Sequence, residues 1–135
     1  MNEIKKVLLI SFLLAFFSGC QSFLGVDNAT KINIDFQWSS KSGCSDISPP
    51  IQVNNIPEKT HILKFKMVDL DYKPYNHGGG EVLYQGNAIP EGALKSYGGP
   101  CPPNGSHTYE ITVQALNKEK NLILGEGVSQ RKYPE

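Results

Sequence analysis

The sequence predicts an all-β domain, a sandwich with long loops rich in glycine and proline and with little helix. Apolar and polar residues alternate with a period of two in three stretches, which is the pattern of half-buried strands. Clusters of glycine and proline separate these stretches and exclude long helices. The alternating stretches are Ile32 to Trp38, Leu63 to Met67 and Thr108 to Ala115.

The first element along the chain is a secretion signal. Lys5 and Lys6 precede an apolar run, Val7 to Phe17, that is too short to remain in a bilayer as a span of roughly 20 residues. Ser18-Gly19 stands directly before Cys20, an order that resembles the lipobox of bacterial lipoprotein precursors. We therefore predict a lipoprotein signal peptide over residues 1–19 and acyl chains such as palmitate on Cys20. The alternative is an ordinary signal peptide followed by a chance cysteine.

The lipid anchor implies a location. Acyl chains contribute about 0.8 kcal/mol for each buried methylene, so several of them hold a protein on the membrane. Gln21 follows the cysteine where the inner-membrane retention signal of enterobacteria has aspartate. We expect a protein of the bacterial cell envelope on the outer membrane, with residues 20–30 as the lipidated tether and residues 31–135 as one β domain.

The rest of the chain offers shorter elements. Extended runs are expected at Glu81 to Tyr84 and at Leu122 to Leu124, and only Glu91 to Tyr97 is suited to a helical turn or two. The clusters predicted to form loops between the strands are Ser48-Pro49-Pro50, Gly78-Gly79-Gly80, Gly98-Gly99-Pro100 and Pro102 to Gly105.

Charge and cysteine content exclude several classes. The chain has 13 Lys and Arg against 13 Asp and Glu, so its charge does not favour nucleic acid. With Cys20 lipidated, Cys44 and Cys101 remain in a compartment where disulfides persist. They permit one bridge, with two buried free thiols as the alternative. No second Cys or His stands at ligand spacing from either, so neither a metal site nor a cofactor is expected.

One loop carries a motif. Gly99 to Tyr109 reads Gly-Pro-Cys-Pro-Pro-Asn-Gly-Ser-His-Thr-Tyr. It resembles the signature of the phosphatidylethanolamine-binding protein family, which includes the Raf kinase inhibitor-like proteins of bacteria. The resemblance implies a β-sandwich and a Cys44–Cys101 disulfide, because exported bacterial members often pair cysteines at these positions. Further segments follow in the family's order between about Phe36 and Leu116: Cys44 to Ile51, Asn55-Ile56-Pro57, Val68 to Asp71, and Ala88-Ile89-Pro90.

The resemblance also implies a small pocket for anions such as phosphate, acetate or a phospholipid head group. Carried over to this chain, the pocket draws on Asp69, the backbone at Gly99 and Pro100, and the side chains of His107 and Tyr109. His107 and Tyr109 are two residues apart, so they share one face of a strand and can both donate hydrogen bonds to a phosphate oxygen. Asp69 is expected to orient His107. The alternatives are a strand-end cap for His107 and a core aromatic for Tyr109.

The chain departs from the family at one ligand. A His-Trp pair is expected a few residues before Ala88, but Val82 and Leu83 stand there, and the nearest histidine is His77. Either His77 enters the pocket, with Gly78-Gly79-Gly80 offering backbone amides to the anion, or it lies in a plain flexible loop.

These features predict a lipid-anchored envelope protein that binds a small anion or phospholipid head group without turning it over. No serine lies in a nucleophile elbow, so the protein is not expected to be an enzyme. The alternative is a protein-interaction module of the envelope, because relatives in this family bind and inhibit enzymes such as kinases or proteases.

Overall fold

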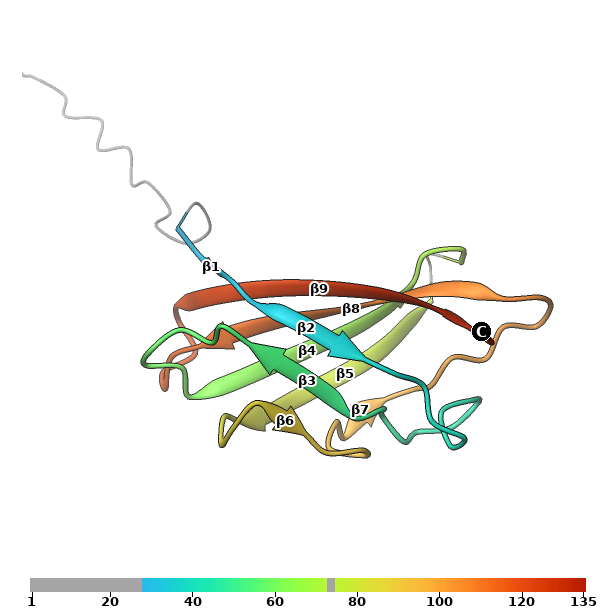
Figure 1. Cartoon of the computed structure of the whole chain (residues 1–135), viewed down its shortest axis with the longest axis horizontal. Coiled ribbons are helices and arrows are strands. Elements are labelled where there is room, and N and C mark those ends of the chain that lie inside the picture. Colours follow the sequence, from blue (N-terminus) through green and yellow to red (C-terminus); the bar gives the residue numbers. More distant parts are fainter. Residues whose placement is uncertain (1–27, 73–74) are drawn as a thin grey trace, which may run out of the picture.

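The computed structural model describes residues 28–72 and 75–135, and it confirms an all-β fold of two sheets (Figure 1). The predicted signal peptide and Cys20 lie outside the described residues. None of the described residues lies in a helix, so this part of the chain contains no helix that could cross a membrane.

The larger sheet has six strands in the order β1-β9-β8-β4-β5-β7. All its neighbours are antiparallel except β1 and β9, which run parallel. Along β4, Phe65 and Met67 are buried whereas Lys64 and Lys66 face solvent, which is the predicted alternation. The strands of this sheet are β1 (Thr30–Lys31), β4 (Ile62–Asp69), β5 (Asn76–Leu83), β7 (Ser96–Tyr97), β8 (His107–Leu116) and β9 (Ile123–Tyr133).

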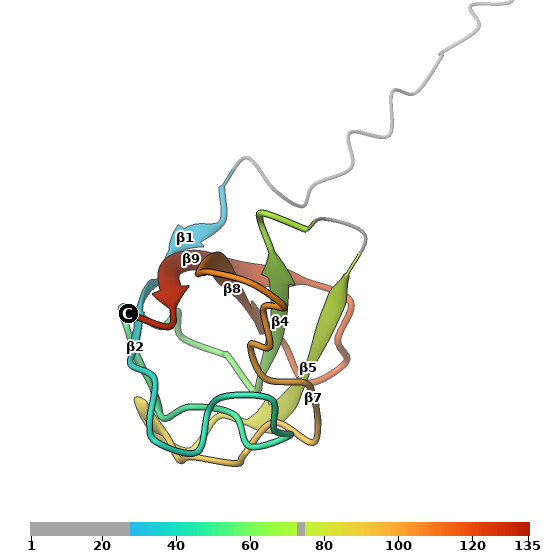
Figure 2. The same ribbon diagram turned by 90° about the vertical axis from the view of Figure 1, so that its right-hand side faces the viewer.

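The smaller sheet consists of β2 (Asn33–Phe36), β3 (Ile51–Asn54) and β6 (Ala88–Ile89), in the antiparallel order β2-β3-β6. Figure 1 shows β2 and β3 lying across the larger sheet, and the turned view in Figure 2 shows the two layers enclosing the interior. Buried apolar side chains from both sheets fill this space, and their removal from water is the main source of stability. They include Phe36, Val53, Leu63, Met67 and Val113.

The glycine triplet was wrongly predicted to be a loop. Gly78 to Gly80 lie inside β5, between β4 and β7. A β-carbon at Gly79 would collide with the carbonyl oxygen of Phe65, and one at Gly78 would collide with the carbonyl oxygen of Ser96. The three glycines therefore let three strands approach one another closely, and their amides are not gathered into an anion-binding loop.

Two further predictions need correction. Glu91 to Tyr97 forms turns and β7 in place of a helical turn, because Gly92 has a φ of 75° and Ser96 and Tyr97 pair with β5. The short run predicted at Leu122 to Leu124 is the beginning of an eleven-residue strand, β9. Gly125 and Gly127 interrupt the apolar alternation of that strand and conceal it in the sequence.

The predicted disulfide is confirmed. It joins Cys44, in the loop after β2, to Cys101, in the loop before β8, across 57 residues. The same two loops share backbone hydrogen bonds: the amide of Cys44 donates to the carbonyl of Pro100 (2.9 Å), and the amide of Gly99 donates to that of Ser45 (2.5 Å). The bridge thus fixes the loop that carries the family-like motif.

Replacing both Cys44 and Cys101 with serine should lower the free energy of unfolding by about 4 kcal/mol, because the bridge restricts a 57-residue loop in the unfolded chain. Urea unfolding of the double variant beside the parent measures this loss. Thiol labelling of the denatured parent, mapped by mass spectrometry, should leave both cysteines unlabelled. A loss below about 1 kcal/mol would show that the paired loops hold without the bridge.

Candidate functional site

A pocket of about 380 Å³ lies at one end of the larger sheet and is lined by four of the predicted site residues. Asp69 ends β4, His77 lies near the start of β5, and His107 and Tyr109 begin β8. These three strands are neighbours in the order β8-β4-β5, and Asp69 is paired with Tyr109. The sheet therefore brings together side chains that are up to forty positions apart in the chain.

Gly99 and Pro100, which were predicted with these residues, do not line the pocket. Both are buried behind its wall, where they make the backbone hydrogen bonds to the Cys44 loop. The wall itself comes from Cys101 and Pro103. The motif thus shapes the pocket through its rigid loop and the disulfide, whereas its last residues supply the polar groups.

Asp69 and His107 form a hydrogen-bonded pair at the base of the pocket. The Nδ1 of His107 lies 2.6 Å from the Oδ2 of Asp69. The other oxygen of Asp69 accepts hydrogen bonds from the amides of Asp71 (2.8 Å) and Tyr72 (3.0 Å). Since the carboxylate accepts from Nδ1, the Nε2 of His107 is the ring nitrogen left for a ligand. The expectation that Asp69 orients His107 agrees with this geometry.

His77 reaches the same pocket from β5. Its Nδ1 lies 3.0 Å from the carbonyl oxygen of Gly98, and because a carbonyl can only accept, Nδ1 carries the proton. The ring packs against Tyr75, with centroids 4.4 Å apart, and meets the edge of Tyr109 at 5.2 Å. His77 is therefore a buried strand residue with a free Nε2, and the flexible-loop interpretation is wrong.

Tyr109 forms the floor of the pocket. Its side chain is fully buried, yet its hydroxyl has no hydrogen-bond partner among the described residues. Burial, together with the negative charge of Asp69, raises the pKa of Tyr109 to about 12, so the hydroxyl stays protonated. A buried hydroxyl without a partner costs about 1–3 kcal/mol, and a ligand that accepts from it recovers part of that cost.

The pKa of Asp69 is set by opposing effects. Burial would raise it, but the hydrogen bond from His107, the amides of Asp71 and Tyr72 and the nearby charge of His107 together lower it below the ordinary value. Asp69 therefore remains ionised although only 4 % of its surface is exposed.

The mouth of the pocket was missed by the sequence reasoning. Tyr72 and Tyr75, from the connection between β4 and β5, line it and are more than half exposed. Their only signal in the sequence is the presence of two aromatic residues close to Asp69. Among the described residues, no three His, Cys, Asp or Glu side chains are grouped so that they could hold a metal ion. The pocket is therefore built for hydrogen bonding, with two imidazoles and one phenol facing a small space.

Asp69→Asn should destabilise the protein at pH 7 by about 2 kcal/mol, the range for hydrogen bonds to a charged group. The pKa of Asp69 is lower in the folded state than in the unfolded chain. The ionised carboxylate therefore adds its full share to the free energy of unfolding above the unfolded pKa of about 3.9, and that share is lost as the pH falls through the folded pKa. The difference in the free energy of unfolding between parent and variant, measured by urea unfolding, should therefore be smaller at pH 3 than at pH 7. Asp46→Asn, at an exposed position, is the control. A gap that is the same at both pH values would contradict this account.

Two solved structures share the fold. A putative phosphatidylethanolamine-binding protein homologue from Chlamydia trachomatis superposes with a TM-score of 0.57 at 20% identity, covering 80% of this chain and 99% of that chain. YbcL of Escherichia coli, described as a member of the mammalian phosphatidylethanolamine-binding protein family, gives a TM-score of 0.57 at 15% identity, covering 76% and 97%. At these identities the likeness shows the fold alone. No curated protein matches the sequence.

A family model supplies the remaining evidence. The model for phosphatidylethanolamine-binding proteins matches residues 77–133, which run from His77 through the Gly99 to Tyr109 motif to the end of β9. The matched segment therefore contains three of the pocket's polar residues and the cysteine that closes its wall. Together with the shared fold, this match over 57 of the chain's 135 residues supports a place for the chain in the phosphatidylethanolamine-binding protein family.

Proposed function

We propose that this protein is a lipid-anchored component of the bacterial cell envelope whose pocket binds a small oxyanion or a phospholipid head group. The main support is the Tyr109 hydroxyl, which is buried without a partner among the described residues. It lies in one pocket with His77 and His107, each of which keeps Nε2 free. The Tyr109 hydroxyl can donate to an oxygen of a phosphate or carboxylate, and each Nε2 can donate as well when its imidazole is protonated, because Nδ1 already carries the proton of the neutral ring.

The Asp69 carboxylate lies against the imidazole of His107. When His107 is protonated, Asp69 offsets its charge and Nε2–H points a charge-assisted donor at the ligand. A volume of about 380 Å³ is at the small end of ligand pockets and suits a head group better than a whole lipid.

The length of the proposed tether limits how far the pocket can lie from the membrane. Residues 20–30 can span at most about 35–40 Å when fully extended. Figure 1 shows β1, where the tether joins the domain, at one end of the sandwich, and the strand ends that carry the pocket at the other. A domain anchored at Cys20 would thus present its pocket away from the anchor, toward ligands in the surrounding compartment. We propose that the ligand is bound without being chemically converted.

Metabolic labelling with palmitate should mark the full-length protein, because we propose that Cys20 carries lipid. Cys20→Ala should abolish the label and release the protein from the membrane fraction or stall its precursor. Cys44→Ala is the matched control, since Cys44 lies in the disulfide, and it should keep the label. A parent that is unlabelled and freely soluble would refute the anchor.

Inorganic phosphate should raise the melting temperature of the protein, because a ligand that binds only the folded state stabilises it by about 1.4 kcal/mol at ten times its Kd. Tyr109→Phe should remove most of this shift without lowering the melting temperature of the unliganded protein, because only an unpartnered hydroxyl is lost. Tyr97→Phe is the matched control. Tyr97 also has a buried hydroxyl with no partner among the described residues, but it does not line the pocket.

Further ligands and variants separate the alternatives. A larger rise in melting temperature with phosphoethanolamine than with phosphate would identify a head-group site. Equal rises would identify a site for phosphate alone. His77→Gln and His107→Gln should each weaken the shift. If phosphate, acetate and phosphoethanolamine all fail at millimolar concentration, the ligand proposal fails and the protein-interaction module replaces it.

A further inference from the structure

One end of the larger sheet carries an apolar cluster that is separate from the core between the two sheets. Ile62 begins β4 and Leu116 ends β8, and both are buried although neither belongs to the main core cluster. Ile62 pairs with Leu83 of β5 and with Leu116, which pairs in turn with Ile123 of β9. Because Ile62 is two residues from the exposed Lys64, this row crosses the outer face of the sheet.

The turn between β8 and β9, residues 117–122, covers only the middle of this row. Lys120 in the turn forms an ion pair with Glu81 on β5, so the turn extends across β4. At the two margins of the turn, Leu83 stays 59 % exposed and Leu122 stays 49 % exposed. Two leucines at one end of the sandwich are thus left uncovered by the described residues.

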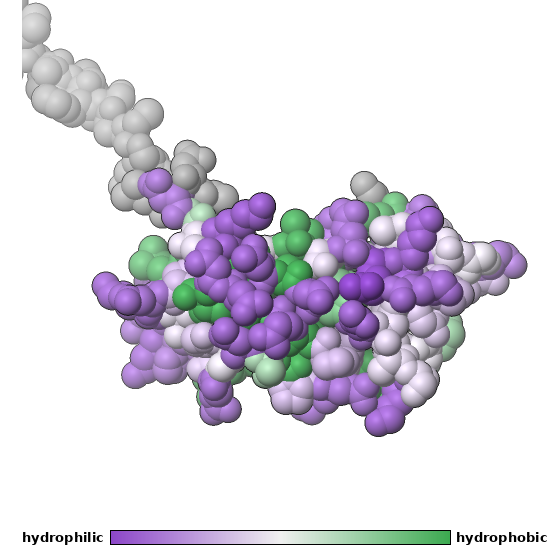
Figure 3. All heavy atoms as spheres, in the orientation of Figure 1, coloured by the Kyte–Doolittle hydropathy of each residue, from purple (hydrophilic) through white to green (hydrophobic). Residues whose placement is uncertain are grey.

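The same end receives the chain that leads from Cys20. Thr30, the first residue of β1, pairs with Gly125, two positions after Ile123. Figure 1 shows β1 and the turn between β8 and β9 at one end of the sandwich, and Figure 3 shows hydrophobic residues among hydrophilic ones there. If Cys20 is acylated, residues 20–30 hold this end within about 35–40 Å of the bilayer.

The charges around this end nearly balance. The ion pair neutralises Glu81 and Lys120, and Glu119 accepts a hydrogen bond from the side-chain amide of Asn117 (3.0 Å). A nearly neutral surface has little attraction for a charged partner, so its preference depends on apolar contact. The lysines and glutamates at this end are Lys31, Lys59, Lys64, Lys118 and Lys120, and Glu58, Glu81, Glu119 and Glu126.

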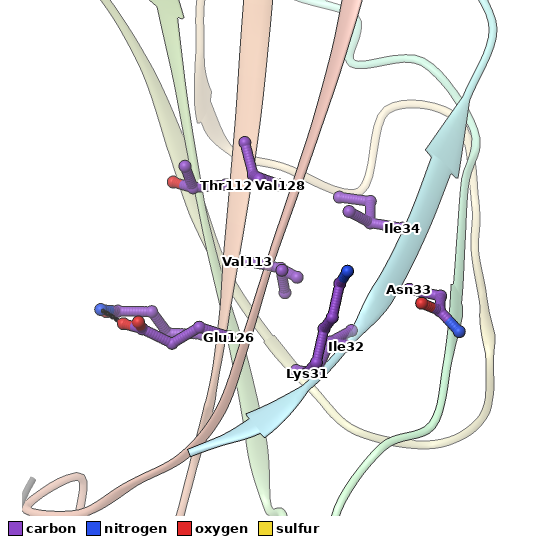
Figure 4. A pocket seen from close by; sticks show the side chains of 10 residues that line it. Lys31, Ile32, Asn33, Ile34, Thr112, Val113, Glu126 and Val128 are labelled. Carbon is purple, nitrogen blue, oxygen red and sulfur yellow. Dashed lines mark hydrogen bonds between the residues drawn. The ribbon is translucent and has the colours of Figure 1, made fainter. Parts of the chain in front are cut away.

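A second apolar surface, on the side of the sandwich, is less suited to a bilayer. It is a cavity of about 460 Å³ between β2 and β9. Figure 4 shows the side chain of Lys31 extending between Ile34 and Val113, and Glu126 also lines the cavity. An ammonium and a carboxylate at the opening are costly to transfer into hydrocarbon. Val128, which lies beside this cavity, therefore marks the competing surface.

We propose that the end of the larger sheet with Leu83 and Leu122 rests on the membrane and inserts these two side chains at the lipid head groups. The inference rests on the lipid anchor of the proposed function, because two half-exposed leucines bind a bilayer weakly by themselves. Attachment through Cys20 raises their effective concentration at the bilayer, so a weak contact is enough to orient the domain. β8 then leads away from the membrane, and the histidine pocket opens toward the surrounding compartment.

The test attaches residues 20–135 to vesicles chemically, so that it does not depend on acylation in the cell. Cys44 and Cys101 are joined in a disulfide, which leaves Cys20 as the third cysteine of the chain and its free thiol. This thiol is coupled to a maleimide lipid in phosphatidylcholine vesicles whose acyl chains are brominated. Bromine quenches the fluorescence of a tryptophan that lies close to the acyl chains.

Tryptophans placed on the two surfaces report which one meets the lipid. The parent contains Trp38 alone and supplies the background. Leu83→Trp and Leu122→Trp should each be quenched at least about twice as strongly as Val128→Trp, because side chains bound at a membrane surface lie only about 5–10 Å deep. Val128 is a matched control, since it is 57 % exposed and lies roughly 17 Å along β9 from Ile123.

Hydrogen exchange tests the same contact without a tryptophan. The amides of residues 117–122 should exchange more slowly in the coupled parent than in the uncoupled parent. Leu83→Asp combined with Leu122→Asp should abolish this slowing, whereas Val128→Asp should preserve it. All three positions are exposed, so the melting temperature of the uncoupled variants should stay close to that of the parent.

Three outcomes overturn the inference. Quenching of Val128→Trp that equals that of Leu122→Trp would place the side cavity against the lipid. Absence of quenching at all three tryptophans would show that the domain stands off the bilayer on its tether. Exchange at residues 117–122 that coupling does not change would exclude a contact by this turn. An absent palmitate label together with the expected quenching would refute the anchor in the cell and leave the membrane-binding surface intact.

Discussion

The carboxylate of Asp69 is buried at the end of β4, and it stays ionised there because His107 and the amides of Asp71 and Tyr72 donate to it. Three donors outweigh the cost of burial, which is why the pKa of Asp69 falls although burial alone would raise it. The pocket depends on this group in two ways. It holds the ring of His107 through Nδ1, which leaves Nε2 as the unbonded ring nitrogen, and its charge helps to keep the hydroxyl of Tyr109 protonated.

The position of His77 depends on a different constraint, the close approach of β4, β5 and β7. Glycines 78–80 permit this approach because β-carbons there would meet the backbone of the neighbouring strands. With β5 held in the sheet, His77 points inward and its Nδ1–H reaches the carbonyl of Gly98. His77, which lies several positions before the place where the family's histidine is expected, thus reaches the pocket because β5 carries it there. Its geometry follows from packing and does not require mobility of the loop.

The parts of the fold that sequence predicted are those governed by local pattern. Alternation identified the cores of β4 and β8, and the motif identified the disulfide and the polar residues of the pocket. The parts of the fold that the sequence did not predict depend on tertiary contacts. Gly125 and Gly127 lie against the backbone of Thr30 and Ile32, so their role in β9 exists only once β1 is in place.

The same limit applies to the pocket. Tyr72 and Tyr75 reach its mouth through the path of the β4–β5 connection, which no periodicity describes. Gly99 and Pro100 belong to the motif, yet the structure uses them to bind the Cys44 loop. A motif therefore identified the region of the site, whereas the role of each residue depended on which face of a loop or strand it occupies.

Trp38 connects the end of β9 to the pocket. Trp38 donates from Nε1 to the carbonyl of Lys132 and so covers one end of the β9 edge. Its ring also packs edge-on against Tyr109, with centroids 5.9 Å apart, behind the floor of the pocket. Because aromatic rings in such contacts have few alternative positions, the orientation of Trp38 ties the end of β9 to Tyr109, whose hydroxyl has no hydrogen-bond partner among the described residues. The edge of the larger sheet and the pocket at its end are therefore held by one continuous aromatic cluster, which also includes Phe36 and Tyr133.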